Sequence, residues 1–600
     1  MLQDSDLVSI QEVRTKVEKA WAAWQKFREF SQEQVDAIVE RMAEAARANA
    51  RKLAELAAEE TRYGNATDKF AKNLLAAELL PQRLRGMKTI GILRELPEER
   101  ITEIAVPVGV VAAVLPTTNP TSTAIFKTLI AVKAGNSVVV SPHPRAKGCS
   151  CATVEILYRA ALSAGAPEGL LQCLTQPTME ATQALMGHPK TAIILATGGS
   201  AMVKAAYSSG KPAFGVGPGN VPVLLDTSAD VHDSIGKLIS GKSFDYGTLC
   251  SSEQVLVTES SRRSAVLQAL TAHGAHLCTP EQGKALERVL FAKGTAVNPE
   301  LVGSPAVKIA QAAGFSVPES TRVLACEIGG IGKDHPLSAE KLSPVLAVYF
   351  VADFEKALDA CAAVLAFHGM GHTCGIYTND EARARQYAMR MPAHRVLVNT
   401  PTPQGSVGIT TNVFPSMTLG CGAMAGNATG DNITPLHLLH VKRLAWAVRA
   451  PHEALPALGK PATVSSVEGT TVSAGPVDRS RVVAAVEKFL AGRGAIPASS
   501  SAADVVDRFL ARRSQPAPAA SAPQCPIPGL PAPAEPERRI TDFVCEDDVR
   551  QAIREGHQIF ICPKSIVTPA ARDLAGQQRD PILVLTKGTA PKPGAVRNDY

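Results

Sequence analysis

Aromatic side chains are scarce in this 600-residue chain, and neither sign of charge is concentrated in it. Phenylalanine, tryptophan and tyrosine make up 4% of the residues, and 62 basic against 56 acidic residues leave a formal net charge of +6. The basic residues form no long block, and no aromatic residues are interleaved with the arginines. Nucleic-acid binding typically requires both features, so we expect no nucleic-acid partner.

Long apolar segments are also missing. The longest apolar run, residues 105–115, is interrupted by Pro107 and Gly109 and is too short to span a bilayer as a helix. The first residues include Asp4 and Asp6 rather than a basic start and an apolar core, so nothing there is typical of a secretory signal. We therefore expect a soluble, cytoplasmic protein with no membrane partner.

The cysteines lack the regular spacing of a disulfide scaffold or a zinc module. Twelve of them are scattered along the chain, which is typical of reduced thiols in a cytosol. The nearest approach to a metal cluster is His143 with Cys149 and Cys151, and a Cys-x-Cys pair without a second pair is more often structural. We predict no metal site.

Hydrophobic periodicity indicates the fold. Helical spacing extends from Ser9 to about Leu80, and Ser31 is a candidate helix cap. From Ile101 onward, short apolar runs alternate with helical segments, which is typical of a parallel sheet covered on both faces. The strands are expected at residues 106–115, 137–140, 192–196 and 221–225. We predict an α/β fold of nucleotide-binding architecture.

Polar loops follow these expected strands. Residues 116–120 (PTTNP) follow the first strand, and residues 196–200 (ATGGS) follow the third, where two glycines let backbone amides approach a ligand. Residues 215–220 (GVGPGN) look like a dinucleotide fingerprint, but Pro218 breaks the spacing and a strand is expected next, so the phosphate-loop signal is weak.

A second α/β region is expected after residue 250. Its helices are predicted near residues 262–273 and 280–291, its strands near 345–350 and 395–399, and a loop at 368–375 (HGMGHTCG). Beyond about residue 464 the composition becomes rich in Ala, Pro, Ser and Gly, which is typical of linkers.

Cys250 lies in a short polar stretch, residues 243–253 (SFDYGTLCSSE), directly before an apolar run at residues 255–257. Backbone amides in such a loop can favour a thiolate, and the following strand would fix its position, as a nucleophile requires. Most single cysteines are instead small buried hydrophobes, so the local pattern alone leaves both interpretations open.

Six segments, in order along residues 5–450, resemble the CoA-acylating aldehyde dehydrogenases, in particular the aldehyde dehydrogenase half of bifunctional aldehyde and alcohol dehydrogenases. They are PTTNPTSTAIFK (116–127), SPHPRAK (141–147), ILATGGSAMVKAAYSSGKPAFGVGPGN (194–220), EKLSP (340–344), NTPTPQG (399–405) and TLGCG (418–422). The resemblance implies an aldehyde dehydrogenase fold, with a Rossmann-like NAD-binding domain and an α/β catalytic domain.

The resemblance also implies a chemistry. The Cys250 thiolate would add to the aldehyde carbonyl, and the Asn119 side-chain amide and a backbone amide near Cys250 would hold the oxyanion. Hydride would pass to NAD, and coenzyme A would take the acyl group from Cys250. Val216 stands about where hydrolytic relatives carry a glutamate base, so thiolysis is favoured over hydrolysis. His372 could assist proton transfer or CoA entry, or it could be a loop histidine satisfied by backbone.

The cofactor residues are also implied by the resemblance. The loop of Thr197, Gly198 and Gly199 would lie against the nucleotide, and Glu340 would bind the nicotinamide ribose. Ser141 replaces a lysine of ordinary family members, which favours NAD over NADP. The candidate cofactor-binding residues are Pro116, Thr117, Ser141, Thr197, Gly198, Gly199, Gly217 and Glu340.

Two short segments of the C-terminal region repeat each other. Residues 486–491 (VEKFLA) and 506–511 (VDRFLA) each predict a short amphipathic helix that is marginal unless it docks onto something. They resemble the encapsulation peptides that route enzymes into bacterial microcompartments, and the alternative is an ordinary assembly helix or a linker. They imply shell proteins as partners and the microcompartment lumen as location. The segment TPAARDLA (568–575) has no assigned role.

The sequence therefore predicts an NAD-dependent, CoA-acylating aldehyde dehydrogenase for a short aldehyde, propanal before acetaldehyde, which forms a dimer or tetramer. The alternatives are a hydrolytic aldehyde dehydrogenase and a shell-binding scaffold with a vestigial catalytic half. We expect an NAD-binding domain with N-terminal helices at residues 1–230 and a catalytic thiol domain at 231–415. A segment that returns to the core and mediates oligomerisation is expected at 416–464. A linker with the two helices follows at 465–539, and a small C-terminal module at 540–600.

Overall fold

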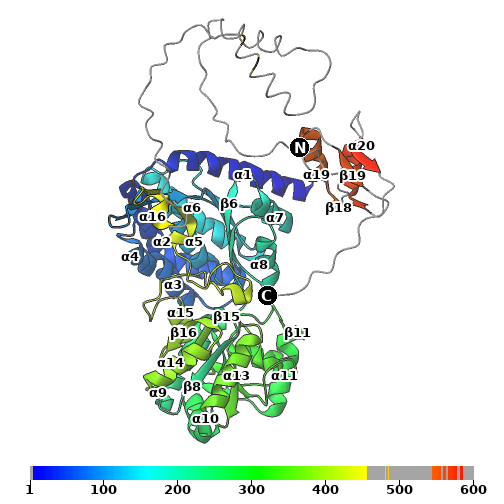
Figure 1. The fold of residues 1–600 in the computed structure, drawn as a ribbon. Helices are drawn as coiled ribbons and strands as arrows, with labels where there is room; N and C mark the ends of the chain where they lie inside the picture. Colours follow the sequence, from blue (N-terminus) through cyan, green and yellow to red (C-terminus); the bar gives the residue numbers. More distant parts are fainter. Residues whose placement is uncertain are drawn as a thin grey trace. The chain divides into compact units, whose positions relative to one another are not determined.

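The computed structural model describes residues 4–455, 480, 484, 543–555, 558–561, 565–576 and 582–585 (Figure 1). The chain divides into two compact units, residues 1–461 and 462–600. Within the described ranges, no helix combines the length and apolar character needed to cross a bilayer. No group of three or more His, Cys, Asp or Glu side chains in these ranges is placed to hold a metal ion.

Helices open the first unit, as the periodicity predicts. α1 (Ser5–Phe27) and α2 (Gln32–Thr61) are followed by α3 (Ala66–Leu74), a π-helical turn (Leu75–Leu79) and α4 (Leu80–Leu84). Ser31 Oγ accepts a hydrogen bond from the Gln34 amide, and the Gln34 side chain accepts one from the Ser31 amide at 2.8 Å. The predicted cap at Ser31 is confirmed as a reciprocal capping box.

A five-stranded parallel sheet forms the first layer of this unit. Its order is β5 (Leu171–Cys173), β4 (Ser137–Ser141), β3 (Val110–Val114), β6 (Thr191–Thr197), β7 (Ala213–Val216). The connecting helices are α5 (Pro120–Lys133), α6 (Lys147–Ser163), α7 (Met179–Gly187) and α8 (Ser200–Tyr207).

Both faces of this sheet are covered. Successive side chains of β3 point to opposite faces: Val111 packs in a cluster with residues of α2, α5 and α6, and Val110 packs in another with residues of α1 and α7. The predicted parallel sheet with helices on both faces is therefore confirmed.

The apolar run at residues 106–115 is not one strand, as predicted, but parts of two. β2 (Ile101–Pro107) ends at a proline that has no N–H to donate, and Gly109 has a φ of 129° that turns the chain into β3. β2 instead pairs antiparallel with β1 (Ile92–Leu96) and β17 (Leu439–Ala445) in a separate three-stranded sheet.

A seven-stranded parallel sheet forms the other half of the unit, shown in green in Figure 1. Its order is β10 (Ala275–Leu277), β13 (Val323–Glu327), β14 (Val345–Val351), β9 (Glu253–Glu259), β8 (Val221–Leu225), β15 (Gly371–Tyr377), β16 (Ala393–Val398). Its helices are α9 (Val231–Ser243), α10 (Arg263–Ala272), α11 (Pro280–Leu290), α12 (Ala306–Ala312), α13 (Phe354–Ala366) and α14 (Glu381–Arg390). Since β8 belongs to this sheet, the chain enters it before residue 230.

The segment predicted as a loop at residues 368–375 is largely a strand. β15 lies between β8 and β16, and all seven of its residues are buried. Its first residues, Gly-His-Thr-Cys-Gly, contain no run of large apolar side chains, so the sequence pattern favoured a loop. The correction matters because it places His372 on a strand that is paired on both sides.

The second unit has a small core of its own. β18 (Phe543–Val544) pairs with β20 (Ile566–Val567), β19 (Ile559–Ile561) pairs with β21 (Leu583–Leu585), and the helices are α19 (Glu546–Glu555) and α20 (Pro569–Gly576). Val544, Val549, Ala552, Ile559 and Ala571 form the core. The repeated segments at 486–491 and 506–511 lie outside the described residues.

Candidate active site

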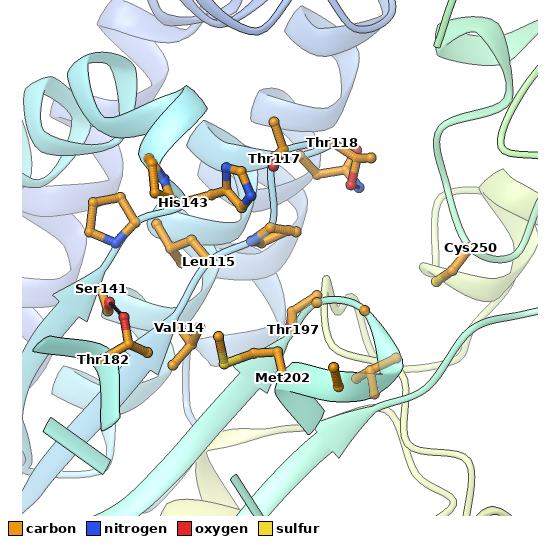
Figure 2. Close-up of a pocket in the computed structure, with 18 of the residues that line it drawn as sticks. Val114, Leu115, Thr117, Thr118, Ser141, His143, Thr182, Thr197, Met202 and Cys250 are labelled. Atoms are coloured by element: carbon orange, nitrogen blue, oxygen red, sulfur yellow. Dashed lines mark hydrogen bonds between the residues drawn. The ribbon is translucent and has the colours of Figure 1, made fainter. Parts of the chain in front are cut away.

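The direction of strand order reverses at β3 in the five-stranded sheet, because the chain runs from β3 to β4 and β5 on one side and then to β6 and β7 on the other. In open parallel sheets, ligands bind at the carboxyl ends of the strands beside such a reversal. The loops after β3, β4 and β6 line a cavity of about 850 Å³ at this place (Figure 2).

This cavity gathers nearly all of the residues singled out from the sequence. In Figure 2, Thr117, Ser141 and Thr197 belong to the five-stranded sheet and its loops, and Cys250 faces them from a segment of the other half. Ten of the eleven predicted site residues line the cavity: Pro116, Thr117, Asn119, Ser141, Thr197, Gly198, Gly199, Gly217, Cys250 and Glu340. The eleventh, His372, is not a lining residue but contacts the sulfur of Cys250.

The part of the cavity over β4 and β6 offers groups that could hold a phosphate. Gly199 is the N-cap of α8 and offers no capping side chain, and a Cβ placed on it would meet nothing within 4 Å, so the first amides of α8 are accessible to a phosphate. Ser141 Oγ lies 2.9 Å from Thr182 Oγ1. No lysine or arginine stands among the described residues that line the cavity. Burial, and then the charge of Arg145, lower the pKa of His143.

Cys250 lies three residues before β9 and is partly accessible. Burial, together with the negative charge of Glu340, raises the pKa of the Cys250 thiol to about 12, and the positive charge of Arg395 opposes the rise. The thiol is therefore protonated at neutral pH in the free protein.

His372 places its Nε2 atom 3.1 Å from Cys250 Sγ, and its Nδ1 atom lies 2.9 Å from Thr373 Oγ1. The buried Arg395 donates from Nε to Thr373 Oγ1 at 3.2 Å, which leaves the Thr373 hydroxyl hydrogen free to be donated to His372 Nδ1. In that arrangement the imidazole proton is on Nε2, facing the sulfur. Burial and Arg395 hold the pKa of His372 well below its usual range, which keeps the ring neutral.

Asn119 is the N-cap residue of α5, yet its side chain makes no capping hydrogen bond. Its Oδ1 atom instead accepts from Lys72 Nζ at 2.5 Å, and its Nδ2 atom donates to Thr118 Oγ1 at 3.0 Å. Lys72, Thr373 and Arg395 were missed by sequence reasoning. A lysine on an amphipathic helix is ordinarily read as solvent-facing, and no local pattern distinguishes Lys72.

Two further residues complete the cavity wall near Cys250. Glu340 Oε1 accepts from the Gly219 amide at 3.2 Å, and burial raises the pKa of its carboxyl to about 7. Val216, the last residue of β7, is buried and also lines the cavity. Val216 therefore presents an apolar side chain to this cavity.

Comparison with known proteins identifies the family. The model of the aldehyde dehydrogenase family matches residues 4–289. An acetylating aldehyde dehydrogenase from Geobacillus thermoglucosidasius is 47% identical, with a TM-score of 0.74, over 75% of this chain and 99% of that one. The chain belongs to the aldehyde dehydrogenase family. The aldehyde dehydrogenase fold expected from the sequence is confirmed.

Two other relatives of this aldehyde dehydrogenase bear on its chemistry. The bifunctional aldehyde-alcohol dehydrogenase of Escherichia coli K12 is 43% identical over 445 residues, or 73% of this chain, so the chain spans about half the length of that relative. A propionaldehyde dehydrogenase from the fucose utilisation microcompartment of Clostridium phytofermentans is 26% identical with a TM-score of 0.66, over 73% of this chain and 98% of that one.

Proposed function

We propose that this aldehyde dehydrogenase converts a short-chain aldehyde, coenzyme A and NAD into acyl-CoA and NADH through a thioester on Cys250. One observation carries the proposal: Cys250, Asn119 and the apolar Val216 line one cavity. The sequence resemblance aligns Val216 with the carboxylate of hydrolytic relatives. The acetylating relative from Geobacillus supports the same reaction class.

The side chains of the site divide the reaction between them. Cys250 gives its thiol proton to solvent and Sγ adds to the aldehyde carbon, while Asn119 Nδ2 and a backbone amide near Cys250 stabilise the oxyanion. Bound NAD would accept the hydride, and the loop of Thr197, Gly198 and Gly199 would contact its phosphates. When CoA attacks the thioester as a thiolate, Cys250 leaves as a thiolate, which the His372 Nε2 hydrogen stabilises.

We propose NAD as the preferred oxidised cofactor. No described side chain of the cavity wall carries the permanent positive charge that would favour a 2′-phosphate, and the sequence resemblance aligns Ser141 with the lysine of ordinary family members. The ratio of kcat/KM for NAD to that for NADP should be about 10 to 150, because a charge-assisted hydrogen bond contributes about 1.5–3 kcal/mol. A ratio below one would contradict the proposal.

An assay of NADH formation with and without CoA tests the reaction. With propanal or acetaldehyde we expect CoA-dependent NADH and a stoichiometric acyl-CoA product, and Cys250→Ala should abolish both. Equal NADH formation without CoA, with free acid as the product, would instead identify the hydrolytic alternative. Absence of any aldehyde-dependent NADH in the folded, full-length protein would favour the scaffold alternative.

Packaging in a microcompartment is part of the proposal. It is supported by the two amphipathic repeats of the sequence and by the microcompartment origin of the Clostridium phytofermentans relative. A chain cut near residue 464 should stay active but lose its co-purification with shell proteins. Unchanged co-purification would contradict the targeting role of the repeats.

We also propose that two or four copies associate through the three-stranded sheet. β17 is an edge strand whose residues after Leu439 are exposed, and Leu444, Trp446 and Val448 are each about half exposed or more. An exposed apolar edge strand is a template for pairing with another chain. Light scattering should give a dimer or tetramer, and Val441→Lys with Leu444→Lys should shift it to a monomer.

A further inference from the structure

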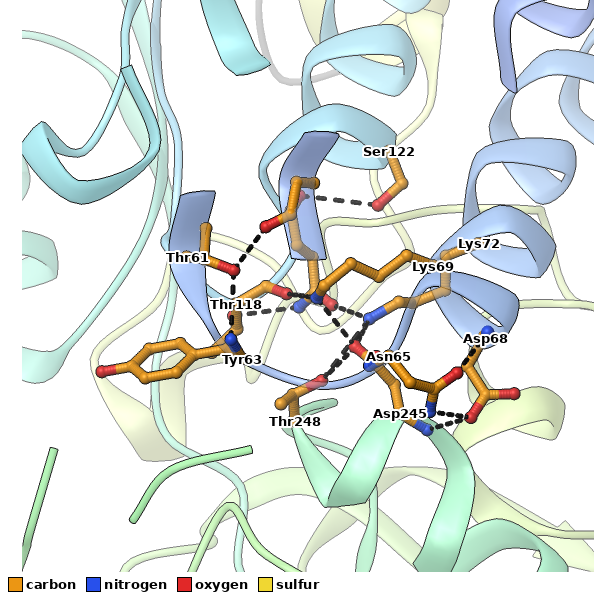
Figure 3. Close-up of polar contacts among 12 residues, drawn as sticks. Thr61, Tyr63, Asn65, Asp68, Lys69, Lys72, Thr118, Ser122, Asp245 and Thr248 are labelled. Atoms are coloured by element: carbon orange, nitrogen blue, oxygen red, sulfur yellow. Dashed lines mark hydrogen bonds and ion pairs between the residues drawn. The ribbon is translucent and has the colours of Figure 1, made fainter. Parts of the chain in front are cut away.

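A buried ionic cluster, drawn in Figure 3, contacts the side chain of Asn119 through Lys72. Lys69 and Lys72 extend from α3 to the carboxylate of Asp245, which lies five residues before Cys250 in sequence. The side chains of all three are at most 2% exposed. Charges that are removed from water so completely are costly unless each has a partner, so the cluster fixes its members in space.

The Asp245 carboxylate is fully engaged. It accepts from Lys69 Nζ at 3.1 Å, from Thr248 Oγ1 at 2.6 Å, from the Asn65 amide at 2.8 Å, and from Lys72 Nζ. Asp245 itself has a φ of 48°, in the left-handed region that few non-glycine residues adopt. The cluster therefore ties α3 to the segment that leads into Cys250.

Lys72 also contacts the amide of Asn119. An asparagine amide can be turned over so that either its oxygen or its nitrogen faces a given direction, and an ammonium group has hydrogens to donate but no lone pair to accept. Because Lys72 Nζ lies 2.5 Å from Oδ1, the oxygen must face Lys72 and the nitrogen must face the other way. An N-cap asparagine would otherwise direct its oxygen to its own helix.

We propose that Lys72 is a positioning residue for the oxyanion site, which locks the Asn119 amide with its NH₂ group available to the substrate oxygen. The inference rests on the proposed role of Asn119. One Nδ2 hydrogen is used by Thr118, which leaves the second for the oxyanion. The buried positive charge on the oxygen side of the amide also polarises its N–H bonds, which strengthens their donation. Burial lowers the pKa of Lys72 to about 8, against the opposing charge of Asp245, so most of the Lys72 population is charged at pH 7.

Lys69 provides a matched control. It lies on the same helix, is equally buried and shares the Asp245 carboxylate, but it donates to the Thr118 carbonyl at 3.0 Å rather than to the Asn119 side chain. Lys69→Met and Lys72→Met should therefore destabilise the cluster to a similar degree, while only the second removes the contact with the amide.

The test measures kcat, the KM for aldehyde and the alkylation rate of Cys250 by iodoacetamide in the full-length protein. Removal of an oxyanion donor lowers kcat by about 10²–10³-fold, so we expect Asn119→Ala to fall in that range and Lys72→Met to lower kcat by about 10- to 100-fold. For Lys72→Met, aldehyde KM and Cys250 alkylation should stay within about threefold of the parent, and Lys69→Met should retain kcat within about threefold.

The double variant Lys72→Met with Asn119→Ala separates positioning from a structural role. If Lys72 acts through the amide, its replacement should change kcat by no more than about twofold once the amide is gone. An equal loss of kcat in both backgrounds, or an equal loss in Lys69→Met, would overturn the inference. If Lys72→Met does not fold, Lys72→Gln replaces it in the test, because glutamine keeps a hydrogen-bond donor without the charge. Its effect on kcat should likewise disappear in the Asn119→Ala background. Full activity of Asn119→Ala would refute the proposed oxyanion role itself.

Discussion

Replacing Val216 by glutamate should give this aldehyde dehydrogenase a hydrolytic activity. Val216 ends β7, is only 4% exposed and lines the cavity that also contains Cys250. A carboxylate at this position could take a proton from a water molecule that attacks the thioester on Cys250. The prediction follows directly from the argument that the missing base preserves the thioester for CoA.

The magnitude can be worked from Glu340, which lines the same cavity. Burial raises the pKa of Glu340 to about 7, and we expect a glutamate at position 216 to be raised to a similar extent. About half of it would be ionised at pH 7 and about nine tenths at pH 8, so hydrolysis should increase between these pH values. A positioned general base contributes about 10²–10⁴-fold, and we expect acid formation to rise by at least about 100-fold at pH 8.

The assay follows NADH and free acid in the absence of CoA, with Val216→Gln as a control that has the same shape but no base. Both variants place a polar group in a buried site, so both will lose some stability, and only the glutamate should gain hydrolysis. Acid formation by Val216→Glu no faster than by Val216→Gln would refute the reasoning that a missing base at this position prevents hydrolysis.

Two other predictions concern the nucleophile. Burial raises the pKa of the Cys250 thiol to about 12, so its thiolate fraction should increase about tenfold per pH unit. The rate of Cys250 alkylation by iodoacetamide in the NAD-free protein should therefore increase about tenfold per pH unit from pH 7 to 10. A plateau of this rate at or below pH 8 would show a resting thiolate instead. Replacing Thr373 by valine should let the His372 imidazole place its proton on Nδ1, which removes the hydrogen-bond donor facing the Cys250 sulfur. Alkylation of Cys250 at pH 8 should then slow about tenfold or more, whereas Thr373→Ser should behave as the parent. Equal rates in the two variants would contradict a proton on Nε2.

The cavity-lining residues could be predicted from the sequence because they follow strands. The loops at 116–120 and 196–200 come after continuous apolar runs, and parallel strands place their carboxyl ends at one edge of the sheet. Their roles came from the resemblance to a family and not from spacing. Cys250 alone was ambiguous between a nucleophile and a buried hydrophobe, and only its place opposite those loops adds physical support for the first.

Strand boundaries failed where the apolar pattern was misleading. The run at 106–115 was continuous in composition, but Pro107 and Gly109 divide it between two sheets of different direction. The reverse occurred in β15, where backbone pairing with β8 and β16 forms a strand from a segment whose first five residues include no large aliphatic side chain. A loop would allow the His372 imidazole to move relative to Cys250, whereas a strand paired on both sides holds the His372 backbone in place.

The contacts that orient the reacting groups could not be found in the sequence because their partners are distant in it. Lys72 meets Asn119 across 47 positions and Asp245 across 173, and His372 meets Cys250 across 122. Removing one partner of a buried ion pair destabilises a protein by about 3–5 kcal/mol, while replacing a whole buried cluster with apolar residues is often neutral. Stability alone therefore does not require two lysines and an aspartate at this place. The contact of Lys72 with the Asn119 amide supplies a chemical reason under the proposed oxyanion role: a donor must be aimed at an oxyanion before it forms, and a buried charge fixed by Asp245 and Thr248 can hold that donor in position.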